Sequence, residues 1–222
     1  MSALLQCVEV QTDAAPAATV ILLHGLGADG YDFVPVVREF EAHGAPSARY
    51  VFPHAPTMPV TINGGYVMRA WYDILGTDLV RREDDKGIRA SQAMVEALIQ
   101  REVDRGTPRS RIVLAGFSQG GAITLHTGLR QHEPLAGLVA LSCYLPLADS
   151  FSGEAAGGSA RVPIFLAHGT SDPVVPMARG AASRDVLRAA GYDVQWHEYP
   201  MPHSVSAEEI RDIAEFLQRV LA

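Results

Sequence analysis

The chain has 222 residues, of which 48% are hydrophobic and 19% are charged, and its formal net charge is −7 at pH 7. This length suits one α/β domain over residues 1–222, and so apolar a composition argues against a disordered chain. The acidic charge, without any Lys/Arg cluster, argues against a nucleic-acid-binding surface.

The two cysteines, Cys7 and Cys143, lie far apart in the sequence and fit free thiols in a reducing compartment. No secretory signal is recognisable at the N-terminus, and no apolar stretch reaches the roughly 18 residues of a spanning helix. We therefore expect a cytoplasmic protein without stable membrane insertion.

Short runs rich in Val, Ile, Leu and Phe recur along the chain and predict strands. They lie at 19–23, 49–52, 111–115, 138–141, 162–167 and 194–199. Most of these runs are continuous rather than alternating, which is typical of strands buried on both faces of a parallel sheet.

Amphipathic stretches lie between these runs. Apolar residues at helical spacing predict one helix over 87–104 and another at the C-terminal end, which a capping box of Ser206 and Glu209 begins. Strands that alternate with helices indicate an open, doubly wound, mostly parallel sheet with helices on both faces. Sites in such sheets lie at the carboxyl ends of the strands.

The segment "GFSQGG", residues 116–121, directly follows one of the predicted strands and fits the pattern G-x-S-x-G. In a nucleophile elbow, glycines allow a very tight strand-to-helix turn that leaves the serine exposed at its tip. Small residues also occur at such turns for packing reasons, so Ser118 needs partners before the pattern indicates catalysis.

Two further side chains follow later strands in the order Ser, acid, His that this arrangement requires. Asp172 lies in the loop after the strand at 162–167, and His203 lies in the loop after the strand at 194–199. Alone, Asp172 is explained by a simple Asx turn and His203 by a solvated loop. Their joint placement with Ser118 predicts a catalytic triad.

Ester chemistry also needs donors for the oxyanion that develops at the carbonyl. The backbone N–H of Gln119, next to the serine, is one candidate. Leu26, in the segment "HGLG" after the first predicted strand, supplies the other.

Two rival functions remain open. The segment "GLGADG", residues 25–30, fits G-x-G-x-x-G and would suit a nicotinamide-dependent oxidoreductase. However, no helix is expected directly after it, and no acidic residue ends the next strand. A non-catalytic binding module on a hydrolase fold is the second rival. No metal-ligand spacing is found.

Six segments together resemble one known family. "LLHGLGADG", "FPHAPTMPVTINGGYVMRAWYDI", "AGFSQGGAITL", "LSCYLP", "HGTSDPVVP" and "YPMPHSV" are similar to the carboxylesterase and acyl-protein thioesterase (lysophospholipase-like) family of α/β hydrolases. The resemblance runs from about residue 19 to the C-terminus. It implies the same triad and oxyanion donors, an α/β-hydrolase fold without a large cap domain, and no cofactor.

The resemblance also implies a substrate pocket and a class of substrate. The segment at 61–76 would help to form the acyl pocket, with Tyr66, Met68, Trp71 and Leu75 as lining residues. Expected substrates are small esters with short to medium acyl chains, lysophospholipids or other lipids, and thioesters of acylated proteins. The oligomeric state stays open, a homodimer included.

Overall fold

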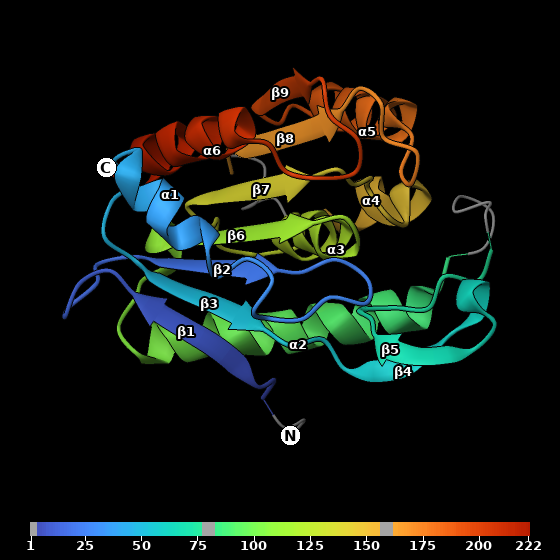
Figure 1. Ribbon diagram of the computed structural model, residues 1–222, viewed down its shortest axis with the longest axis horizontal. Helices are drawn as coiled ribbons and strands as arrows, with labels where there is room; N and C mark the ends of the chain where they lie inside the picture. The colour runs from blue at the N-terminus through green and yellow to red at the C-terminus, as the bar shows by residue number, and fades with distance from the viewer. Residues whose placement is uncertain (1–3, 77–82, 156–161) are drawn as a thin grey trace.

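A seven-stranded sheet forms the centre of the computed structural model, which describes residues 4–76, 83–155 and 162–222 (Figure 1). The strand order is β1-β3-β2-β6-β7-β8-β9, and only β1 runs antiparallel to its neighbour. The strands are β1 (Cys7–Gln11), β2 (Thr19–Leu23), β3 (Arg49–Pro53), β6 (Ile112–Phe117), β7 (Gly137–Leu141), β8 (Ile164–Gly169) and β9 (Val194–Tyr199).

The strands predicted from the sequence are all present in this sheet, so the mostly parallel architecture is confirmed. Two of them end two residues later than expected, β6 at Phe117 and β8 at Gly169. Gly116 still pairs with Leu23 of β2, and Gly169 with Tyr199 of β9, so the ladder continues through both glycines. Strand β1, at the sheet edge, was not predicted.

Helices cover both faces of the sheet, as predicted (Figure 1). Helices α1 and α6 pack on one face, over an apolar layer that includes Phe40 and Phe216. Helices α2, α3, α4 and α5 contribute to the other layer, around Leu114 and Leu138. The helices are α1 (Val36–Ala42), α2 (Asp85–Asp104), α3 (Gln119–Gly128), α4 (Ala148–Glu154), α5 (Met177–Ala189) and α6 (Ala207–Val220).

Side chains cap the two helices that the sequence predicts most clearly. The Asp84 carboxylate accepts a hydrogen bond from the Gly87 N–H at the start of α2. The Ser206 hydroxyl accepts one from the Glu209 N–H at 3.1 Å at the start of α6. Such caps satisfy backbone donors that have no partner within the helix. None of the described helices is long and apolar enough to cross a membrane.

A small antiparallel hairpin stands apart from the main sheet. It consists of β4 (Thr57–Val60) and β5 (Tyr66–Arg69), joined through the 3-10 turn η1 (Thr61–Asn63). The arrowheads of β6, β7 and β8 point toward the side of the molecule where this hairpin lies (Figure 1). The hairpin therefore stands near the carboxyl ends of the parallel strands.

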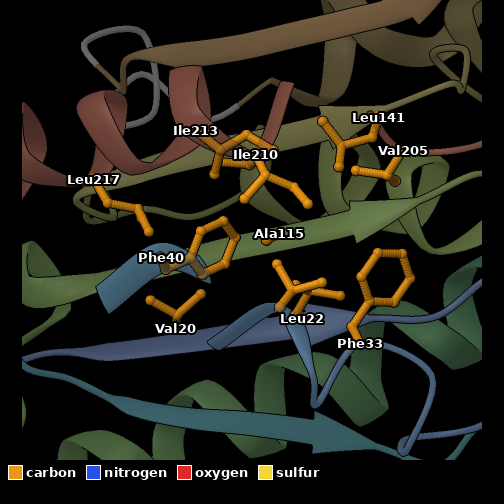
Figure 2. A pocket seen from close by; sticks show the side chains of 12 residues that line it. Val20, Leu22, Phe33, Phe40, Ala115, Leu141, Val205, Ile210, Ile213 and Leu217 are labelled. Atoms are coloured by element: carbon orange, nitrogen blue, oxygen red, sulfur yellow. The ribbon is translucent and has the colours of Figure 1, made fainter. Parts of the chain in front are cut away.

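The layer under α1 and α6 leaves only a narrow gap of about 10 Å³. Figure 2 shows that side chains from the sheet and from α6 converge on this gap, with Phe40 of α1 beside them. A space of this size is about one water molecule, and wholly apolar walls keep such a space dry. Its lining is Val20, Leu22, Phe33, Val36, Phe40, Ala115, Val139, Leu141, Val205, Ile210, Ile213 and Leu217.

Candidate active site

The turn between β6 and α3 is strained at Ser118. This residue has φ 54° and ψ −119°, a conformation that non-glycine residues seldom adopt. A Cβ on Gly116 would lie 2.3 Å from the Gly120 carbonyl oxygen, and a Cβ on Gly120 would lie 2.3 Å from that of Leu23. Only glycines allow this close approach, which explains the segment "GFSQGG" and fixes the serine at the tip.

Three side chains from separate loops form one hydrogen-bonded chain. His203 Nε2 lies 2.9 Å from Ser118 Oγ, and His203 Nδ1 lies 2.6 Å from Asp172 Oδ2. Because the carboxylate accepts from Nδ1–H, Nε2 is left free to accept the serine proton. The three loops follow β6, β8 and β9, so the sheet brings together residues that are far apart in the sequence.

The loop around Asp172 holds its carboxylate firmly. Its Oδ1 accepts the N–H groups of Val174 and Val175 at 2.8 and 2.9 Å, and the side chain is fully buried. One carboxylate oxygen therefore makes the predicted Asx turn, while the other contacts His203. His168 Nε2 lies 3.5 Å from Oδ2 but bonds to the Val175 carbonyl at 2.7 Å. Burial lowers the pKa of His168, which favours its neutral form.

Two backbone N–H groups are available beside the serine hydroxyl. Gln119 is the first residue of α3, so its N–H has no acceptor within the helix. A Cβ on Gly25 would lie 3.5 Å from Ser118 Cβ, which places the Leu26 loop against the serine. Neither N–H donates to any residue in the described part of the chain. Both residues line the same pocket as Ser118.

His24 fixes the orientation of the Leu26 N–H. Its Nε2 accepts the Ala55 N–H at 3.0 Å, so its Nδ1 carries the proton and donates to the Gly25 carbonyl at 2.7 Å. That carbonyl belongs to the same peptide unit as the Leu26 N–H. A planar trans peptide directs the two groups to opposite sides, so the Leu26 N–H faces away from His24. Burial lowers the pKa of His24, which keeps it neutral.

The Gln119 side chain ties the turn to the segment after β5. Its Oε1 accepts the Trp71 N–H at 2.8 Å, and its Nε2 donates to the Tyr72 carbonyl at 2.7 Å. The Trp71 indole N–H in turn donates to the His24 carbonyl at 2.9 Å. These bonds connect the segments of Leu26 and Gln119, the two predicted oxyanion donors, in one buried network.

A pocket of about 490 Å³ opens beside Ser118. Of the residues predicted to line it, none does. Trp71 is fully buried in the core, and Tyr66, Met68 and Leu75 are not part of the pocket wall. The wall consists of Leu26, Ile62, Asn63, Tyr72, Ile74, Ser118, Gln119, Tyr144, Pro173, Val174, Val175, Pro176 and Arg179.

Sequence reasoning missed most of this wall. Tyr144 follows the predicted strand at 138–141, within the segment "CYLP", so its place at a carboxyl end was a usable signal. Arg179 lies in the first turn of α5, beyond the loop of Asp172, and no pattern pointed to it.

The glycine-rich segment 25–30 does not open a helix, since α1 begins only at Val36. A Cβ on Gly30 would lie 2.5 Å from the Phe52 carbonyl oxygen, so this glycine serves close packing against β3. The geometry therefore does not match a dinucleotide-binding turn. Across the residues whose positions are given, no three His, Cys, Asp or Glu side chains are arranged to hold a metal ion.

Comparison with known proteins shows the family of this chain. The family model described as phospholipase/carboxylesterase matches residues 5–221. Acyl-protein thioesterase 1 of Neurospora crassa is 43% identical over 213 residues, which are 92% of this chain and 87% of that protein.

Two solved structures show the same fold. SOBER1 of Arabidopsis thaliana has a TM-score of 0.86 at 31% identity, over 92% of this chain and 99% of that one. Acyl-protein thioesterase 2 of Zea mays has a TM-score of 0.85 at 28% identity, over 98% and 99%. Both the predicted α/β-hydrolase fold and the predicted family are confirmed: the chain belongs to the phospholipase/carboxylesterase family of hydrolases, with acyl-protein thioesterases among its relatives.

Proposed function

We propose that this protein is a serine hydrolase that cleaves carboxylic esters through an acyl-enzyme. The observation that carries the proposal is the hydrogen-bonded chain from Ser118 Oγ through His203 to Asp172. A serine hydroxyl is a poor nucleophile until a base takes its proton. Here the base lies at hydrogen-bonding distance and is itself oriented by a buried carboxylate.

The reaction proceeds in two similar halves. Ser118 Oγ attacks the carbonyl carbon while His203 Nε2 takes the hydroxyl proton, and the carbonyl oxygen becomes an oxyanion between the N–H groups of Leu26 and Gln119. The tetrahedral intermediate collapses when His203 gives its proton to the leaving alcohol or thiol. Water, activated by the same imidazole, then attacks the acyl-serine and releases the acid. Asp172 stabilises the imidazolium in both halves. These steps need no cofactor.

The substrates that we propose are small esters or lipids with short to medium acyl chains, with acyl thioesters of proteins as a further class. Relatives named acyl-protein thioesterase support the thioester class. Largely apolar side chains such as Ile62, Ile74 and Val174 in the pocket wall support a hydrophobic acyl group. A cytoplasmic location and a homodimer stay predictions of the sequence.

The test is removal of the nucleophile. We expect Ser118→Ala to lower kcat for p-nitrophenyl butyrate by about 10⁶-fold, because the triad members act as a unit. The wild-type protein should also be labelled covalently by a fluorophosphonate, and Ser118→Ala should not.

Ser152→Ala, at an exposed serine of α4, is the matched control and should react like the wild type. Substantial hydrolysis by Ser118→Ala, or no labelling of the wild type, would refute the proposal. The latter result would favour a non-catalytic binding module. A panel of p-nitrophenyl esters from acetate to palmitate, with a palmitoyl thioester beside it, would then establish the acyl preference.

A further inference from the structure

A cation lies in the wall of the pocket beside Ser118, and it has no anionic partner among the described residues. Arg179, in the first turn of α5, lines this pocket together with Ser118 and Tyr144. In the part of the chain that is described, its guanidinium makes neither a hydrogen bond nor an ion pair, and its Nη1 is buried. Among the described residues, the guanidinium lies over the ring of Tyr144, whose centroid is 5.8 Å from Arg179 Cζ.

The buried, unpaired Nη1 of Arg179 is energetically unfavourable in the unliganded protein. A guanidinium carries five N–H donors, and buried donors are nearly always paired because an unpaired one loses its bonds to water. Arg130 shows the usual outcome, since its guanidinium donates to Glu154 at 2.7 and 2.9 Å. Arg179 therefore leaves donors in the pocket that an incoming acceptor would satisfy.

Among the residues that the structure describes, no neighbouring carboxylate forms an ion pair with Arg179. Glu83 is close enough for the two charges to influence each other, but its Oε2 accepts the Leu147 N–H at 2.9 Å and it forms no ion pair with Arg179. Burial raises the pKa of Glu83, with the Leu147 hydrogen bond and the Arg179 charge opposing that rise. The positive charge at Arg179 is thus left for a ligand to complement.

We propose that Arg179 binds an anionic group of the substrate, so that esters carrying a carboxylate or a phosphate are the preferred substrates of this pocket. This inference rests on the proposed function, because the same pocket holds Ser118. A guanidinium suits both anions, since it can donate two parallel hydrogen bonds to either. The net charge of −7 gives such a substrate no long-range steering, so discrimination must come from contact within the pocket.

The rest of the pocket fits an ester with a polar end. Val174 and Pro176, in the wall between the loop of Asp172 and α5, offer apolar surface for a short aliphatic linker. Beside Arg179, the hydroxyls of Tyr72 and Tyr144 lie 3.2 Å apart, so one of them has a proton free to reach the anion. The anion can belong to the acyl group, as in a monoester of a dicarboxylic acid, or to the leaving group, as in an acylated glycerol phosphate.

The test compares matched charged and neutral esters. For the acyl side, p-nitrophenyl hydrogen glutarate is set against p-nitrophenyl valerate; for the leaving-group side, butyryl glycerol phosphate is set against monobutyrylglycerol. Arg179→Met should lower kcat/KM for at least one charged ester by about 10- to 100-fold, the usual effect of a charged hydrogen bond. The neutral partner should change by less than about threefold, which also shows that the variant is folded.

Two further variants sharpen the result. Arg179→Lys keeps the positive charge but cannot donate two parallel hydrogen bonds to one anion. It should therefore be more active on the charged ester than Arg179→Met, but less active than the wild type. Arg184→Met is the matched control, because Arg184 also lies on α5 over an aromatic ring, that of Trp196 at 5.1 Å, but outside the pocket. Arg184→Met should leave kcat/KM for all four substrates unchanged.

The outcomes separate this inference from the proposed function. Three results would overturn the role of Arg179 and leave the proposed function intact. These are equal losses of activity on charged and neutral esters in Arg179→Met, no loss on either charged ester in that variant, or the same selective loss in Arg184→Met. Hydrolysis of the neutral esters by Ser118→Ala would overturn the proposed function itself. Which charged ester responds tells whether the anion lies on the acyl or the leaving-group side.

Discussion

At the scale of single residues, His24 has a structural role that its position in the sequence did not reveal. It precedes Ser118 in the chain, so the order of a hydrolase triad excluded it as the base. Its hydrogen bonds to the Gly25 carbonyl and from the Ala55 N–H instead make it a positioning residue for the Leu26 N–H. An oxyanion donor is effective only when its direction is fixed before the reaction.

We therefore expect His24→Phe to lower kcat by up to about 10²-fold, approaching the loss of one oxyanion donor, with little change in KM. His24→Asn retains a side-chain N–H near the Nδ1 position, and it should recover part of the lost activity. Steady-state kinetics with p-nitrophenyl butyrate measure this, with a thermal melt as a check on folding. A raised KM at unchanged kcat would contradict the positioning role.

At the residue scale, the sequence could predict that three side chains converge, and the structure holds them within hydrogen-bonding distance of one another. Ser118, Asp172 and His203 each follow their own strand, and parallel strands end at the same edge. The pocket wall has no such pattern. Trp71 and Tyr72 are adjacent aromatic residues, yet Trp71 is fully buried in the core while Tyr72 reaches the pocket. Their difference depends on contacts with Gln119 and His24 that no local sequence rule contains.

At the scale of elements, α6 combines a stabilising cap with a costly buried acid. Glu209 occupies the capping-box position after Ser206, but both its side-chain oxygens are buried and have no hydrogen-bond partner among the described residues. Burial is the main cause that raises the pKa of Glu209 to about 8. The capping box predicted the start of the helix correctly, yet it could not reveal that the glutamate lies inside the protein.

The raised pKa makes stability depend on pH. Between the ordinary glutamate value of 4.5 and about 8, the folded state holds a proton that the unfolded state releases. Stability therefore decreases as pH rises through this window, at about 1.4 kcal/mol per pKa unit at most. We expect Glu209→Gln to remove this decrease, so that the variant exceeds the wild type in stability at pH 8 by more than at pH 5.

Urea unfolding at pH 5, 6.5 and 8 measures the difference between the two proteins. Glu208→Gln is the control, because Glu208 lies in the same first turn of α6 but is exposed. That variant should follow the wild type at every pH. A constant difference between Glu209→Gln and the wild type across the window would show that residue 209 does not titrate there.

Elements with a strong apolar pattern were predictable, and elements defined by tertiary pairing were not. Strand β1 reads "CVEVQ" and is only partly buried, so its pairing with β3 at the sheet edge is what makes it a strand. The hairpin of β4 and β5 contains Pro59 and exposed Tyr66 and Val67, which obscure any strand pattern. Its position near the site could not be inferred from its composition.

At the scale of the whole molecule, the two ends of the sheet have different roles: one end holds the candidate site, and the other holds a cluster of ion pairs. The proposed triad and the pocket beside it lie at the carboxyl ends of the strands. At the amino ends, the buried Glu102 of α2 accepts hydrogen bonds from Thr19, the first residue of β2, and from Arg49, the first residue of β3. Arg101 and Arg105 bind its other carboxylate oxygen at 2.9 and 3.1 Å.

We expect Glu102→Gln to destabilise the protein by about 3 kcal/mol at pH 7, because it leaves Arg49 without its carboxylate. Burial raises the pKa of Glu102, but the hydrogen bond from Arg49 and the charges of Arg101 and Arg105 outweigh it and lower the pKa overall. Stability from this carboxylate is therefore present above the ordinary glutamate value of 4.5 and is lost as pH falls below it.

The difference in urea midpoint between Glu102→Gln and the wild type should accordingly shrink between pH 7 and pH 3.5. Asp104→Asn, at an exposed carboxylate near the same helix end, should have little effect at either pH. Because the cluster lies at the end of the sheet opposite the triad, kcat of folded Glu102→Gln should equal that of the wild type. A large loss of kcat at full folding would show that the two ends of the sheet are coupled, contrary to this division of tasks.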